Sequence, residues 1–125
     1  SERHSRRRSA ALVTVQVERA VMAQFDVYAN PSRSAAKGIP YVVVVQSDLL
    51  DGLATRLTIP LATVVFAGRV PEKLCPTLVI DGVRLHALAH YAAPLPALRL
   101  RRPVANVAAH ASTLIAALDV VLSGV

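Results

Sequence analysis

Residues 41–52 read YVVVVQSDLLDG and divide into two parts of opposite character. The first part, Tyr41–Val45, is a β-branched run without polar alternation, which is typical of a strand covered on both faces. The second part, Gln46–Gly52, carries two carboxylates and a glycine, which is the composition of a turn. The stretch therefore predicts a buried strand that runs into an exposed acidic turn.

Another strand is expected just before this one. In Gln24–Ala29 (QFDVYA) apolar and polar residues alternate, which predicts a half-buried strand. Phe25 and Val27 would face the core, and Tyr28 would face outward. Residues 30–40 combine Asn, Pro, Ser and Gly, so we expect them to form an exposed loop between the two strands.

Short strands are also expected after the acidic turn. Leu57–Leu61 and Thr63–Phe66 have strand composition, and Pro60 predicts that the sheet bends or ends there because proline cannot donate a ladder hydrogen bond. The stretch 77–87 (TLVIDGVRLHA) predicts a hairpin, since two apolar runs flank an Asp-Gly pair that favours positive φ. One further strand is expected around Ala97–Arg101.

The hydrophobic period changes after Pro103. Apolar residues then recur three and four positions apart, which predicts an amphipathic helix starting near Pro103 and ending at Ser123-Gly124. The apolar side of this helix would comprise Val107, Ala111, Leu114, Ile115, Leu118, Val121 and Leu122. The expected fold class is α+β, mostly β, with a small barrel-like sheet closed by one C-terminal helix.

Composition limits the classes of protein that remain. The chain has 125 residues and a mass of 13.3 kDa, which suits one domain with its own core. At 54% hydrophobic and 18% charged residues it is too apolar to be disordered. No apolar run approaches the roughly 20 residues of a membrane helix. A single cysteine, Cys75, cannot form an internal disulfide, so we expect a cytoplasmic protein.

The net charge of +6 is unevenly distributed. Residues 1–21 hold five arginines and two glutamates, and we interpret them as an extension outside the natural domain. The domain would then start at Met22 and span residues 22–125. Phe and Tyr total only five and Trp is absent, so the sequence offers no base-stacking platform for single-stranded nucleic acid.

Few side chains suggest chemistry on their own. His86 and His90 have no third ligand at a suitable spacing, so no metal and no cofactor are expected. Asp48 and Asp51 are interpreted as turn caps in preference to paired catalytic acids. Cys75 has no basic neighbour nearer than Lys73, which favours an inert buried thiol.

A basic cluster precedes the predicted helix, formed by Arg99, Arg101 and Arg102. Two interpretations remain open for it. The cluster is either a solvated edge or a contact site for phosphate or for an acidic partner peptide.

From Met22 onward, the order of motifs resembles the CcdB family of toxin–antitoxin toxins. The resemblance covers about residues 22–125, and the Gln-Ser-Asp turn followed by the Ile-Pro-Leu strand is its most specific part. The segments that carry it are MAQFDVYANPS (22–32), VVVVQSDLLD (42–51), TRLTIPLA (55–62) and LCPTLVIDG (74–82).

The resemblance implies a fold and a mode of action. The fold would be an SH3-like barrel with an added small antiparallel sheet and one C-terminal helix. The protein would form a symmetric homodimer, bind the DNA gyrase A subunit and trap the covalent gyrase–DNA complex without catalysis. A CcdA-like antitoxin, whose disordered C-terminal segment folds onto the toxin, would neutralise it. DNA would be reached only through the antitoxin complex, which represses transcription of its own module.

The resemblance also implies which residues bind gyrase. These are Leu49, Leu50, Asp119, Leu122, Ser123, Gly124 and Val125. Gyrase-poisoning members of the family place a Trp just before the terminal Gly-aliphatic pair, where its ring stacks on an Arg of gyrase. This chain has Ser123 there, and Leu122 where a further aromatic is usual. The departure predicts weaker gyrase binding.

Two other functions remain as alternatives. Related barrel toxins cleave RNA, and such an enzyme would use Arg56 or Arg84 with Asp51 or His86. RNA cleavage that disappears in Arg56→Ala would identify it. The chain could instead be a non-toxic remnant that acts as an antitoxin-binding co-repressor. Growth of cells that express the chain with and without Ser123→Trp would separate the gyrase-binding toxin from this remnant.

Overall fold

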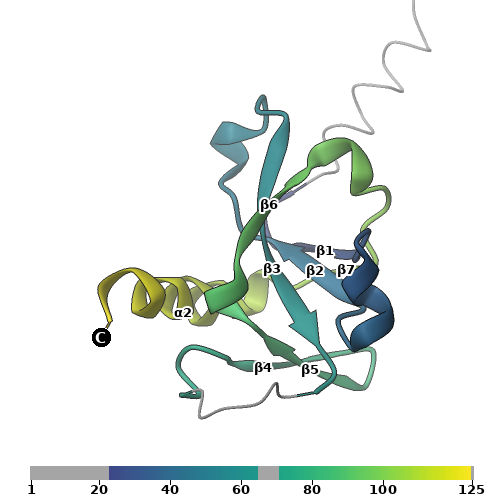
Figure 1. Cartoon of the computed structure of the whole chain (residues 1–125). Coiled ribbons are helices and arrows are strands. Elements are labelled where there is room, and N and C mark those ends of the chain that lie inside the picture. Colours follow the sequence, from purple (N-terminus) through teal and green to yellow (C-terminus); the bar gives the residue numbers. More distant parts are fainter. Residues whose placement is uncertain (1–22, 65–70, 125) are drawn as a thin grey trace, which may run out of the picture.

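The computed structural model of the chain describes residues 23–64 and 71–124 (Figure 1). The predicted extension 1–21 and the residues Val65 and Phe66 of a predicted strand lie outside these ranges. The described part is mostly β, with one α-helix. Its elements are β1 (Asp26–Ala29), η1 (Arg33–Lys37), β2 (Tyr41–Val44), η2 (Asp48–Leu50), β3 (Thr55–Ala62), β4 (Thr77–Ile80), β5 (Val83–Ala87), η3 (Ala89–Tyr91), β6 (Ala93–Pro96), η4 (Ala97–Arg99), β7 (Ala105–Asn106), η5 (Ala108–His110) and α2 (Ala111–Ser123), where η marks short 3₁₀ helices.

One antiparallel sheet of seven strands curls into a nearly closed barrel. Its strand order is β4-β5-β3-β2-β1-β7, and β6 pairs with β3 as well. The long strand β3 connects the parts, because it pairs with β2 along one edge and with β6 and then β5 along the other. The small antiparallel addition expected from the sequence is the β4–β5 hairpin, which continues the sheet at the far end of β3 (Figure 1). The expected α+β, mostly β fold class is confirmed.

The core lies inside the curled sheet, and α2 closes it. Val27, Ile59, Leu61 and Leu85 are fully buried there, and Leu114 of α2 joins the same cluster. Burial of such side chains stabilises the fold by roughly 1.5–3 kcal/mol each. The helix is therefore part of the barrel core.

Strands β1 and β2 are covered on both faces. This confirms the prediction for Tyr41–Val45, but the half-buried pattern predicted for Gln24–Ala29 is wrong. Tyr28 is buried with Val42, Val44 and Leu100 in a second cluster outside the barrel. The segment around Leu100 folds back over the outer face of β1 and β2, so the polar side of the alternation is covered as well.

Pro60 does not interrupt the sheet, contrary to the predicted break into two strands. It lies within β3, opposite Val42. Thr58 still pairs with β6, whereas Leu61 already pairs with β5. Pro60 thus occupies the point where β3 changes partner, a place in which the missing N–H is tolerated, and its carbonyl accepts from the Leu88 N–H at 2.9 Å.

The predicted hairpin at 77–87 is confirmed with its turn. Asp81 and Gly82 have φ values of 52° and 79°, the left-handed pair that a two-residue hairpin turn of this twist requires. The strand predicted around Ala97–Arg101 is wrong. The strand in this region is β6, Ala93–Pro96, which pairs with β3, and η4 follows it.

The helix starts later than predicted, at Ala111 and not near Pro103. Residues before it are used by the sheet, because β7 pairs with β1. The Val104 N–H donates to the Val27 carbonyl at 2.7 Å, and the Val107 N–H donates to the Phe25 carbonyl at 2.9 Å. These bonds keep the segment extended until η5.

Only part of the predicted apolar side of α2 is buried. Leu114 and Ala117 are in the core, whereas Ile115, Val121 and Leu122 are exposed. Figure 1 shows the reason: α2 extends away from the described strands of the barrel towards its C-terminal end. No helix within residues 23–64 and 71–124 is both long and apolar enough to cross a membrane.

Candidate functional site

The end of α2, residues 119–124, forms an exposed apolar projection that we call the helix tip. Leu122 is 84% exposed there, a large fraction for a leucine in a chain with a well-formed core. Gly124 ends the helix with φ 76°, and its N–H donates to the Val120 carbonyl at 2.8 Å. The Ser123 hydroxyl donates to the Asp119 carbonyl at 2.7 Å. The tip is therefore an ordered helix end, while Val125 lies outside the described residues.

A second apolar projection follows β2, in residues 46–54, which we call the leucine loop. Leu49 is 92% exposed and Leu50 is 50% exposed. The residues just before them fix the loop. The Ser47 hydroxyl accepts from the Leu49 N–H at 3.2 Å and so caps η2. Asp48 accepts from the Gln24 N–H at 2.7 Å, so its carboxylate joins the loop to the segment before β1, and the cap expected of Asp48 is made by Ser47 instead.

The side chains of Gln46 and Arg56 hold the leucine loop in place through hydrogen bonds to its main chain. The Gln46 amide donates to the carbonyls of Leu50 and Thr55 and accepts from the Leu57 N–H. Arg56 is 8% exposed, and its guanidinium donates to three main-chain carbonyls. These belong to Asp51, Leu53 and Thr55. This positioning role was not predicted from the sequence, because the main-chain carbonyls that Gln46 and Arg56 contact become close only when the loop folds.

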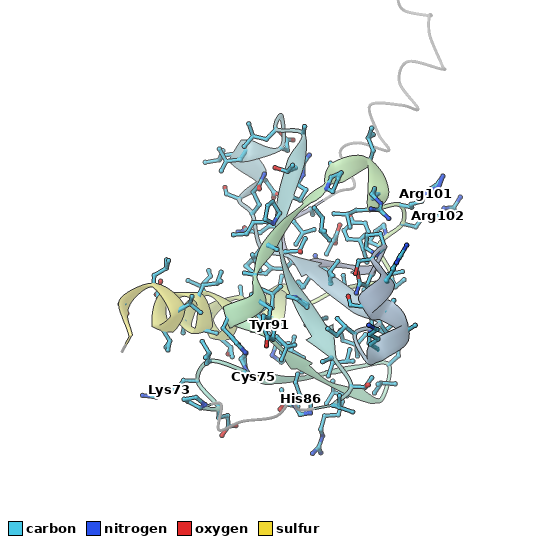
Figure 2. All side chains as sticks on the ribbon, in the orientation of Figure 1. Lys73, Cys75, His86, Tyr91, Arg101 and Arg102 are labelled. Atoms are coloured by element: carbon cyan, nitrogen blue, oxygen red, sulfur yellow. The ribbon has the colours of Figure 1, made fainter. Side chains whose placement is uncertain are left out.

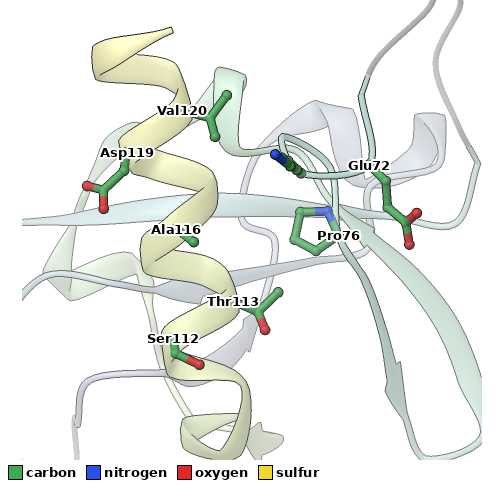
Figure 3. A pocket seen from close by; sticks show the side chains of 8 residues that line it. Glu72, Pro76, Ser112, Thr113, Ala116, Asp119 and Val120 are labelled. Atoms are coloured by element: carbon green, nitrogen blue, oxygen red, sulfur yellow. The ribbon is translucent and has the colours of Figure 1, made fainter. Parts of the chain in front are cut away.

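A groove runs beside the helix tip, with a volume of about 690 Å³ (Figure 3). It separates α2 from the segment that leads into β4, and Asp119 belongs both to the groove and to the tip. Its walls combine hydroxyls, small apolar groups and charges of both signs. The lining residues are Glu72, Lys73, Pro76, Ser112, Thr113, Ala116, Asp119 and Val120.

Comparison with protein-family models identifies the family of this chain. The family model described as CcdB protein matches residues 24–124, most of the chain. The chain belongs to the CcdB family. None of the curated proteins compared matches it. The family comprises toxins of toxin–antitoxin modules, which in general poison DNA gyrase without catalysis.

In this CcdB-family protein the residues expected to bind gyrase are divided between two surfaces. Asp119, Leu122, Ser123 and Gly124 belong to the helix tip, and Leu49 and Leu50 belong to the leucine loop. Figure 1 shows the two surfaces apart: α2 ends on one side of the barrel, and η2 lies above it near the start of β3. A single chain therefore does not assemble these residues into one contact surface.

The basic cluster of this CcdB-family protein lies away from the helix tip. Arg101 and Arg102 are exposed and project from the side of the molecule opposite α2 (Figure 2). Arg99 is also exposed, and its guanidinium donates to the Pro31 carbonyl at 2.8 Å.

The residues named for an RNA-cleaving alternative are distributed over two ends of β3. Arg56 lies near its start, where its hydrogen bonds hold the leucine loop. His86 pairs with Ala62 at its end, and the His86 ring bonds to the Thr77 hydroxyl at 3.2 Å. At roughly 3.3 Å per residue, the length of β3 separates Arg56 from His86 by about 20 Å. These two therefore do not form an acid–base pair.

Two further candidate side chains, Cys75 and His90, have surroundings that indicate a structural role. Cys75 is 8% exposed, which confirms the burial expected from the sequence, and this burial raises the pKa of its thiol. The His90 ring stacks against Tyr91 with centroids 4.3 Å apart.

Tyr28 should make the stability of this protein fall at high pH. Burial and then the negative charge of Asp26 raise the pKa of its phenol from 10.0 to about 12. The folded state thus holds the proton more firmly than the unfolded state. This contribution to stability is present below pH 10 and is lost as the pH rises towards 12. Urea unfolding at a series of alkaline pH values should show a steeper decline for the native chain than for Tyr28→Phe. Equal declines would contradict this prediction.

Proposed function

We propose that this protein is a toxin that binds the gyrase A subunit through its helix tip and traps the gyrase–DNA cleavage complex. The observation that carries the proposal is the exposure of Leu122 on an ordered, glycine-capped helix end. Ile115, two turns earlier on the same face of α2, and the neighbouring Val121 are exposed as well, and an exposed apolar patch of this kind marks an interaction site. The toxin would act in the cytoplasm, where gyrase works.

The energetics of the tip suit a binding surface. Covering a leucine side chain fully contributes about 1.5–3 kcal/mol, and Leu122 has most of its surface left to cover. Because the helix is anchored in the core by Leu114 and Ala117, little ordering entropy is lost when the tip docks. The family's aromatic anchor is replaced by Ser123, so we expect binding to be weaker than in members that keep it.

The mode of assembly follows from the same helix. We infer a symmetric homodimer, because exposed Ile115 lies seven residues before Leu122 and extends the apolar face of α2 beyond the tip. Two copies would also supply two tips and two leucine loops to one gyrase dimer. Leu49 and Leu50 would then make a second gyrase contact, separate from the tip.

The groove beside α2 suits the antitoxin. An extended or helical segment seated there would contact Asp119, which also belongs to the helix tip. Occupation of the groove would therefore interfere with gyrase binding. An antitoxin peptide that folds on binding would neutralise the toxin without a chemical reaction. It would only have to occupy the groove, because the groove and the helix tip share Asp119.

The proposal is tested with purified full-length protein and the gyrase A fragment. We expect a complex in a pull-down and accumulation of linear, protein-bound DNA in a supercoiling assay. Leu122→Ala should weaken binding about tenfold, since it removes roughly 1.4 kcal/mol of buried apolar contact. Leu98→Ala is the matched control, because Leu98 is 95% exposed on η4, away from α2.

Two results would contradict the proposal. One is equal affinity of native protein, Leu122→Ala and Leu98→Ala for the fragment. The other is the absence of binding both in the native protein and in a variant that carries the family's tryptophan at position 123.

A further inference from the structure

Five basic side chains gather on the side of the barrel opposite α2, and we call this surface the basic face. Arg33 and Lys37 come from η1, and Arg99, Arg101 and Arg102 come from the segment after β6; all five are exposed. The two segments are far apart in the sequence but are joined directly, because Arg99 donates to the Pro31 carbonyl at 2.8 Å. Figure 2 shows Arg101 and Arg102 pointing away from the body on this side.

No acidic residue offsets these charges in the segments that build the face. Residues 27–47 contain no Asp or Glu, and neither do residues 82–118. Asp26, the nearest carboxylate in sequence to η1, is buried and accepts hydrogen bonds from Ala23 and Asn106. The five positive charges are therefore not neutralised by acidic residues of these segments, and the basic face creates a concentrated positive potential.

The chemistry of the face fits the phosphates of double-stranded DNA. Four of the five side chains are arginines, which bind phosphate oxygens in a bidentate manner. The two segments that build the face, residues 31–37 and 99–102, contain no aromatic residue, so they lack the stacking surfaces that hold single strands. Duplex DNA presents about one negative charge per 1.7 Å of its axis, so several phosphates can meet one basic face at once.

We propose that the basic face binds the phosphate backbone of double-stranded DNA directly and without sequence preference. The resemblance to the family implied DNA contact only through the antitoxin complex, so this inference goes beyond the proposed function. It does not depend on gyrase binding, which uses the opposite side of the molecule. Phosphate contacts of this kind would hold the toxin on the DNA on which gyrase acts.

The test measures binding of the full-length protein to a labelled random duplex of about 20 base pairs by fluorescence anisotropy over a range of salt concentrations. Each phosphate contact contributes about 0.9 to the slope of log K against log salt. Arg101→Gln/Arg102→Gln should reduce the slope by about 1.8 and weaken binding about tenfold at about 50 mM salt.

The matched control is Lys73→Gln/Arg84→Gln, which removes the same charge from exposed positions elsewhere. Lys73 lies beside the groove, far from Arg101 and Arg102 in Figure 2. This variant should keep the native slope. An equal loss in both double variants would overturn the proposal, because binding would then follow net charge alone. It would also be overturned if the native protein bound no duplex, including the case in which it binds a poly-glutamate peptide instead. Gyrase pull-down of the same variants reports separately on the proposed function.

Discussion

Replacing Ser123 with tryptophan should raise the affinity of this protein for the gyrase A fragment about thirtyfold. An aromatic anchor at the centre of an interface often contributes 2 kcal/mol or more, and each 1.4 kcal/mol corresponds to a factor of ten. Position 123 is where gyrase-poisoning members of the CcdB family carry their tryptophan. The gain should therefore come from one side chain on an unchanged scaffold.

The structure explains why the helix tip can accept the larger side chain. Ser123 is exposed, and its hydroxyl bonds only to the carbonyl of Asp119 in its own helix. The cap at Gly124 is made by the main chain and does not depend on this hydroxyl. An indole at position 123 would lie beside Leu122 and extend the apolar surface of the tip.

Affinity is measured by titration calorimetry, and toxicity by growth of cells that express each full-length variant. Ser112→Trp is the control, because Ser112 is exposed on the first turn of the same helix, far from the tip. Ser123→Trp should bind more tightly and stop growth more strongly than either the native chain or Ser112→Trp. If the native chain is harmless and only Ser123→Trp is lethal, the scaffold is intact and the anchor alone has been lost. An unchanged affinity in Ser123→Trp would contradict the role of the tip.

The elements that the sequence predicted correctly are those set by local pattern. The hairpin 77–87 depends on an Asp-Gly turn between two apolar runs, and the stretch Tyr41–Val45 is too uniformly β-branched to be anything but a buried strand. The turn at Gln46–Gly52 is likewise local at its start, since the Ser47 hydroxyl accepts from the Leu49 N–H two residues on.

The errors occurred where distant segments decide the outcome. Pro60 is tolerated because two different strands reach β3 on either side of it, and no local pattern reports that change of partner. Tyr28 is buried because the segment around Leu100 covers it from 72 positions further along the chain. The late start of α2 has the same origin, as β7 is held extended by its pairing with β1.

The candidate site shows the same division. The family motifs identified Leu49, Leu50 and Leu122, but periodicity placed Leu122 on the covered side of the helix. Leu122 is exposed because α2 extends beyond the barrel, and how far a helix extends beyond its packing partner cannot be predicted from the sequence pattern. The groove could not be predicted either, because its two walls come from residues 72–76 and from α2.

Leu114→Ala should lower the free energy of unfolding by about 3 kcal/mol, the middle of the range for a fully buried leucine. Leu114 has no exposed surface and shares one cluster with Val27, Ile59 and Leu61, so its loss leaves a cavity between α2 and the barrel. Leu98→Ala makes the same chemical change at a side chain that is 95% exposed, and should change stability by no more than about 0.5 kcal/mol. Urea unfolding followed by circular dichroism provides both values.

The same experiment shows whether the helix and the barrel are one cooperative unit. Because Leu114 and Ala117 belong to the barrel core, the loss of helical signal and the loss of tyrosine fluorescence should coincide in both the native chain and Leu114→Ala. A helical signal that is lost at lower urea concentration would mean that α2 detaches while the barrel persists. The tip would then no longer be preorganised, and the binding argument from a rigidly anchored Leu122 would fail. Coincident transitions would instead mean that gyrase binding in Leu114→Ala falls only in proportion to the fraction of unfolded protein.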